Sequence, residues 1–82
     1  MKNRKIIKID KSRATFTKLK DGRTKVVVTK GYFNEDDNWT IWFPEGTQDQ
    51  FGFIPSELVK KRMMHDYGIE LGHYSSTLSM EK

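Results

Sequence analysis

The sequence contains no cysteine, only two prolines and no long apolar run. The lack of cysteine excludes disulfides and thiolate-bound zinc as sources of stability. No apolar stretch approaches the roughly 18 residues that a membrane-spanning helix requires, so no membrane association is expected. The basic residues 1–5 precede only Ile6, Ile7 and Ile9, which is too short an apolar run for the core of a signal peptide. These absences predict a cytoplasmic protein in a reducing compartment.

Common catalytic and cofactor motifs are also missing. There is no glycine-rich phosphate loop, no His-Glu-x-x-His pair and no zinc-ligand spacing. His65 and His73 do not fall on adjacent turns of one helix, and Ser75 and Ser76 have no base fixed near them in the sequence. The acidic stretch 34–38 lacks the twelve-residue ligand spacing of a calcium loop. We therefore predict a protein that is not an enzyme and that holds no metal and no cofactor.

The length of 82 residues indicates one small domain. A domain of this size buries only about 60% of the surface of its unfolded chain, so its stability is modest. Five Phe, three Tyr and two Trp supply large buried areas, and a homodimer would relieve the shortage of core. We predict one domain over residues 1–74, followed by a flexible tail over residues 75–82.

Charge is divided unevenly along the chain. Residues 1–31 hold eleven Lys or Arg and two Asp, a net of +9, whereas residues 32–82 hold four Lys or Arg and nine Asp or Glu, a net of −5. A basic N-terminal part is typical of proteins that bind an anionic partner such as nucleic acid. The alternative is that these lysines form the solvated face of a sheet and protect its edges from pairing.

Apolar and polar residues alternate in several short runs, which indicates strands. The predicted strands cover residues 4–9, 13–19, 24–30, 39–43 and 51–54. Residues 10–12 are expected to form a turn between the first two strands. Asp21-Gly22 lies between the second and the third and predicts a two-residue type I′ hairpin, because Gly accepts positive φ.

The run from Trp39 to Phe43 is the densest aromatic and β-branched stretch of the sequence. Such residues suit a pleated, half-buried surface. Because side chains alternate along a strand, Trp39, Ile41 and Phe43 are expected to face the core, and Trp42 is expected on the opposite face.

One helix is predicted over residues 55–67. Pro55 suits a first helical position, and Gly68 suits the position just past the end. The apolar face would consist of Leu58, Val59, Met63 and Tyr67. The predicted fold class is therefore α+β: an antiparallel sheet of four to five strands, arranged as a meander, with one C-terminal helix packed on it.

The basic strands and their aromatic residues suggest a single-stranded nucleic-acid-binding face. Basic groups neutralise phosphates, and an exposed aromatic ring provides a platform on which a base can stack. The candidate residues are Lys8, Arg13, Lys18, Lys20, Arg23, Lys25, Lys30 and Trp42. Whether the nucleic acid would be DNA or RNA stays open.

Residues 25–64 resemble the transcription-coactivator-like binders of single-stranded DNA. The resemblance lies in the basic sheet, the Trp-containing strand and the run Gly52-Phe53-Ile54-Pro55-Ser56-Glu57 that leads into the helix. It implies a curved antiparallel sheet packed against a helix, a single-stranded DNA partner and dimerisation through the helix.

A second resemblance points to an alternative function. Trp42-Phe43-Pro44, the run from Ile54 to Val59 and the later Gly68 resemble small accessory proteins encoded by bacteriophages. This resemblance implies a protein that binds and inhibits a host enzyme or defence system in the cytoplasm of the host cell. Acidic loops would then meet a basic groove on the host protein, since complementary charge sets specificity. The candidate residues for this role are Glu35, Asp36, Asp37 and Asp49.

Overall fold

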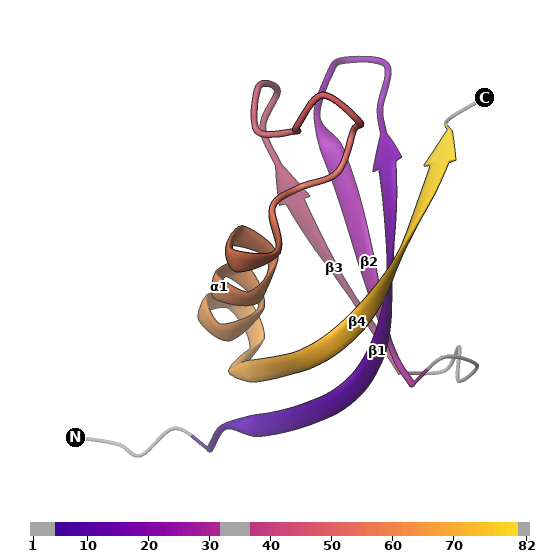
Figure 1. The fold of residues 1–82 in the computed structure, drawn as a ribbon. Coiled ribbons are helices and arrows are strands. Elements are labelled where there is room, and N and C mark those ends of the chain that lie inside the picture. Colours follow the sequence, from indigo (N-terminus) through magenta and orange to yellow (C-terminus); the bar gives the residue numbers. More distant parts are fainter. Residues whose placement is uncertain (1–4, 32–36, 81–82) are drawn as a thin grey trace.

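The computed structural model describes residues 5–31 and 37–80. Within them the chain forms β1 (Ile7–Lys18), β2 (Thr24–Lys30), β3 (Asn38–Phe43), α1 (Ser56–Tyr67) and β4 (Ile69–Met80). These strands make one sheet in the order β3-β2-β1-β4, and α1 packs on one of its faces (Figure 1). The fold is α+β, with one helix and a four-stranded sheet among the described residues.

The sheet is mixed, so the prediction of a purely antiparallel sheet is wrong. β1, β2 and β3 form the expected antiparallel meander, but β4 pairs with β1 in parallel. The reason is the path of the chain between the two edges of the sheet. α1 carries it from β3 at one edge to β4 at the other, and a crossover of this kind is what a parallel pair requires. The helix is therefore followed by a further strand.

The outer half of β4 replaces the predicted tail. Residues 75–80 pair with β1 in a continuous register, from Arg13 opposite Ser75 to Lys18 opposite Met80. Their sequence is rich in Ser and Thr and poor in apolar residues, so no local pattern distinguishes them from a frayed terminus. Hydrogen bonding to β1, a long-range interaction, gives this segment its strand conformation.

β1 is one continuous strand, which corrects the predicted turn over residues 10–12. Ile9 is buried at an odd-numbered position, whereas Ser12 and Phe16 are buried at even-numbered positions on the same side of the sheet. Because inward residues of a regular strand are two apart, the alternation of β1 shifts by one position between Ile9 and Ser12. β4 shifts at the same place, because Leu71 is buried and Tyr74 packs against the core. Both strands curve strongly towards α1 in their first halves (Figure 1).

Gly72 lies where these two curved strands approach each other. A Cβ atom at this position would lie 3.0 Å from the carbonyl oxygen of Asp10 and 3.2 Å from its Cα. We expect Gly72→Ala to lower the free energy of unfolding by about 1–3 kcal/mol, the usual cost of overpacking. Urea unfolding measures this, with Gln50→Ala, a change at an exposed loop position, as the control. A Gly72→Ala protein as stable as the wild type would contradict this close approach.

The hairpin between β1 and β2 lies where the sequence predicts it, but its turn is of another type. The amide of Gly22 donates to the carbonyl of Leu19 (3.0 Å), and the amide of Leu19 donates to the carbonyl of Arg23 (2.8 Å). Gly22 has a φ of 98°, whereas Asp21 keeps a negative φ. The loop is thus a three-residue connection with one left-handed position, and a type I′ turn would require two.

The predicted strand over residues 51–54 is instead part of the loop between β3 and α1. A carboxylate oxygen of Asp49 accepts hydrogen bonds from the amides of Phe51 (2.8 Å) and Phe53 (3.0 Å). Such local bonds give the backbone an alternative to a strand ladder. The loop also covers one end of the core, where the rings of Phe53 and Phe16 meet edge to face at 5.3 Å.

α1 follows its sequence signals closely. It begins at Ser56, one residue later than predicted, with Pro55 in the capping position. Gly68 ends it in the left-handed conformation, with a φ of 70°, as its position in the sequence predicts. Val59 and Met63 are fully buried against the sheet.

The alternation predicted for β3 is confirmed. Ile41 and Phe43 are buried, and Trp39 packs against the same core. Trp42 points to the opposite face of the sheet and is 43% exposed.

Candidate nucleic-acid interface

The face of the sheet opposite α1 is not covered by any described helix or strand (Figure 1). We call it the open face. Strand register and alternation assign to it Arg13, Thr15 and Thr17 of β1, Lys25, Val27 and Thr29 of β2, Asn38, Thr40 and Trp42 of β3, and Ser75, Thr77 and Ser79 of β4.

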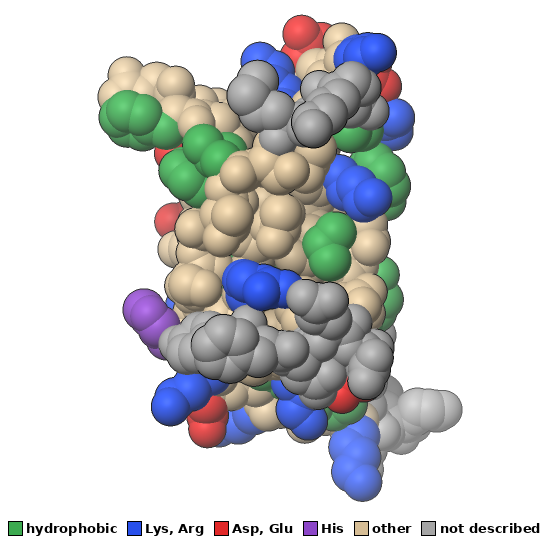
Figure 2. Space-filling view, turned by 90° about the vertical axis from the view of Figure 1, so that its right-hand side faces the viewer, with side chains coloured by type: hydrophobic (Ala, Val, Ile, Leu, Met, Phe, Trp, Pro, Cys, Tyr) green, Lys and Arg blue, Asp and Glu red, His purple; other side chains and the backbone are tan. Residues whose placement is uncertain are grey.

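Hydroxyl groups dominate the open face, and none of the twelve residues assigned to it is acidic. Threonine suits a strand because it is β-branched, and its hydroxyl both donates and accepts hydrogen bonds. Viewed from the side away from α1, the molecule shows a broad surface of uncharged polar groups and backbone, with basic side chains mostly towards its ends (Figure 2). The twelve residues of the open face present no carboxylate that would repel phosphates, and the acidic side chains visible in this view lie at its margins (Figure 2).

Trp42 and two basic side chains meet at one end of the open face. Lys25 is the cross-strand neighbour of Trp42, and its Nζ lies 5.9 Å from the centre of the Trp42 rings. The guanidinium carbon of Arg23 lies 5.3 Å from the same centre. Cations at this distance from an indole are attracted to its π face. The three side chains therefore form a cluster of one exposed aromatic ring and two basic groups, which we call the Trp42 cluster.

The hairpin fixes the position of Arg23. Its Nε donates to one carboxylate oxygen of Asp21 at 2.8 Å, and its backbone amide donates to the other at 3.1 Å. The backbone hydrogen bond from Arg23, together with its side chain, lowers the pKa of Asp21 below the usual range. Asp21 is therefore ionised at neutral pH and holds Arg23 in place while offsetting part of its charge.

The loop between β3 and α1 supports the same hairpin. The side-chain amide of Gln48 donates to the carbonyl of Gly22 at 2.8 Å and to the hydroxyl of Thr24. The side chain of Glu45 lies so close to Gly22 that an added Cβ would be 2.7 Å from its carboxyl carbon. The base of the Trp42 cluster is thus held by contacts from a distant part of the chain.

The predicted basic residues do not form one continuous face. Lys18 and Lys20 lie at the hairpin end of the sheet, and Arg13 is on the open face towards the opposite end. By alternation, Lys18 and Lys30 belong to the core face of the sheet. Both are exposed, because each is the last residue of its strand.

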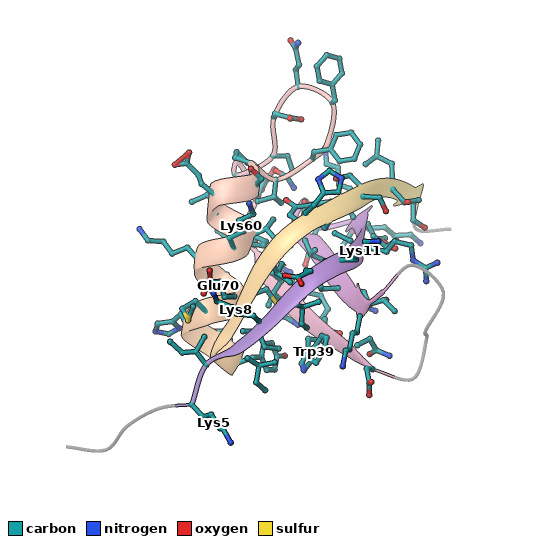
Figure 3. All side chains as sticks on the ribbon, turned by 60° about the horizontal axis from the view of Figure 1, so that its bottom comes forward. Lys5, Lys8, Lys11, Trp39, Lys60 and Glu70 are labelled. Atoms are coloured by element: carbon teal, nitrogen blue, oxygen red, sulfur yellow. The ribbon has the colours of Figure 1, made fainter. Side chains whose placement is uncertain are left out.

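Lys8 lies apart from the other predicted basic residues. It is on the curved first half of β1, beside Glu70 of β4 (Figure 3). A neighbouring carboxylate offsets its charge, so its contribution to a phosphate-binding surface is weaker than the sequence suggests.

The predicted acidic residues are dispersed or already engaged. Glu35 and Asp36 lie outside the described residues. Asp37 continues the pairing of β2 with β3, because its carbonyl accepts a hydrogen bond from the amide of Lys30 at 2.9 Å. The carboxylate of Asp49 organises its own loop.

Two side chains protect the outer edge of β3, a role that sequence reasoning missed; one of them, Tyr67, was predicted for the apolar face of the helix but is 41% exposed. The hydroxyl of Tyr67 donates to the carbonyl of Thr40 at 2.7 Å, and Nη1 of Arg62 donates to the carbonyl of Trp42 at 2.9 Å. Both come from α1. No sequence signal identifies these bonds, because they depend on how the helix crosses the sheet.

Among the described residues no helix is long and apolar enough to cross a membrane. Comparisons of the chain with protein-family models, with curated proteins and with solved structures found no match.

Proposed function

We propose that this protein binds single-stranded nucleic acid on the open face, with the Trp42 cluster as the main contact. The observation that carries the proposal is the position of Trp42. It is a large aromatic residue, 43% exposed, on a sheet face without acidic residues and within 6 Å of two basic groups.

The geometry favours a single strand over a duplex. In a duplex the bases are stacked on one another, whereas an unpaired base offers its flat face to an aromatic ring. Trp42 can take up such a base while Arg23 and Lys25 bind the flanking phosphates. Thr17 lies opposite Lys25, and Thr40 lies two residues before Trp42 on the same face of β3, so their hydroxyls can bond to sugar or base edges.

Charge reversal at the Trp42 cluster tests the proposal. We expect Arg23→Glu with Lys25→Glu to weaken binding of a labelled single-stranded oligonucleotide about tenfold or more, because phosphate contacts supply much of the affinity. Fluorescence anisotropy at about 50 and 200 mM salt measures this, since each lost contact reduces the salt slope by about 0.7.

The matched control is Lys60→Glu with Lys61→Glu, which makes the same change in net charge on the exposed surface of α1. We expect this pair to bind almost as the wild type does. Equal losses from both pairs would mean that only net charge matters. A folded wild-type protein that binds no oligonucleotide at low salt would overturn the proposal.

A further inference from the structure

The two edge strands of the sheet, β3 and β4, differ in whether other parts of the chain bond to their outer edges. Side chains from α1 bond the outward carbonyls of β3, as described above for Tyr67 and Arg62. At the other edge, among the described residues, β4 has no strand neighbour besides β1. The second half of β4 runs along the outside of the molecule (Figure 1), and residues 75–79 are exposed. The outer edge of this segment is therefore available to another strand.

This edge also lacks the sequence features that normally prevent pairing. Natural edge strands carry lysines, other charges or proline, or are very short. β4 is twelve residues long, and residues 71–80 contain no Asp, Glu, Lys, Arg or Pro, although 32% of the whole chain is charged. Leu78 is 48% exposed on this strand.

We propose that β4 pairs with β4 of a second copy of this chain, antiparallel and about a two-fold axis at Ser76. This register is self-complementary. It places Tyr74 of each copy opposite Leu78 of the other on the helix side of the sheet, and Ser75 opposite Thr77 on the open face. Aromatic–aliphatic and hydroxyl pairs of this kind stabilise neighbouring strands.

Charge does not oppose a copy of the same chain at this edge, although it does elsewhere on the surface. Each copy carries a net charge of +4, so two copies repel each other over most of their surfaces. The uncharged second half of β4 is where they can approach with the least repulsion. Each copy contributes the same β4 edge, so the contact is isologous and the assembly stops at two copies.

The paired sheets would place both open faces on the same side. The two Trp42 clusters would then lie on one continuous surface, at its two outer ends. The dimer does not depend on the proposed function, because it follows from the edge of β4 alone.

A charge-pair experiment tests the dimer. Ser76→Lys places two lysines opposite each other at the two-fold axis, and like charges in directly opposed positions weaken pairing. Sedimentation of the full chain over a roughly hundredfold range of concentration should show a wild-type dimer and a Ser76→Lys monomer. Ser76→Glu alone should also be monomeric, whereas an equal mixture of the two variants should form a heterodimer. Gln50→Lys, an exposed change of the same charge in a loop, should remain dimeric.

A single cysteine provides a second measurement, because the chain has none of its own. Ser76→Cys should form an intermolecular disulfide much faster than Gln50→Cys, since opposed residues in paired strands bring their Cβ atoms to about 5 Å. Circular dichroism checks that each variant is folded. A folded wild type that stays monomeric throughout, or a dimer unaffected by Ser76→Lys, would overturn the proposal.

Discussion

Ile41→Ala is expected to lower the free energy of unfolding by about 2–5 kcal/mol, the usual range for deleting a large aliphatic side chain from a core. Ile41 is 1% exposed and lies at the centre of the inward face of β3, so its loss leaves a cavity that the neighbouring side chains cannot readily fill. The total stability of a domain is about 5–15 kcal/mol, and a small one lies towards the lower end. Ile41→Ala should therefore unfold a substantial fraction of the molecules.

Urea unfolding followed by circular dichroism measures this effect. The control is Trp42→Ala in the neighbouring position, which removes a larger side chain from the opposite face. We expect it to cost clearly less than Ile41→Ala, because Trp42 contacts solvent and two basic side chains at the surface of the sheet. If Trp42→Ala proved the more damaging change, the assignment of the two faces would be wrong.

The same Trp42→Ala protein is expected to lose affinity for a single-stranded oligonucleotide by about 1–3 kcal/mol, the contribution of one base stacked on an aromatic side chain. Trp42→Phe should restore part of that affinity, since a smaller ring still offers a flat surface. Anisotropy titrations of the three proteins at one low salt concentration compare these affinities directly.

Phe51 provides the matched control for Trp42. It is 66% exposed in the loop before α1 and is not part of the open face, so Phe51→Ala removes an exposed aromatic ring elsewhere on the molecule. We expect its affinity to equal that of the wild type. A loss after Phe51→Ala that matched the loss after Trp42→Ala would place the binding surface on the loop instead of the sheet.

Features that depend on neighbouring residues could be predicted from the sequence. The alternation of β3 follows from its run of aromatic and β-branched residues. The end of α1 follows from Gly68, whose left-handed conformation is strained for other residues. The hairpin lies where Asp21-Gly22 predicts it, although the pattern gave the wrong turn type: the observed loop is one residue longer than a two-residue turn, and only Gly22 takes a positive φ. The exposure of Trp42 likewise follows from alternation alone.

The sequence could not predict how the strands are arranged beyond the meander. Residues 75–80 form a strand only because β1 lies beside them, and the crossover by α1 brings them there. The same crossover places Arg62 and Tyr67 against the outer edge of β3, and it leaves β4 as the edge without such protection. Local composition contains no information on contacts between residues so far apart in the chain. The sequence by itself thus determined which face of β3 carries Trp42, and only the tertiary structure decided which basic groups surround it and which edge of the sheet stays open.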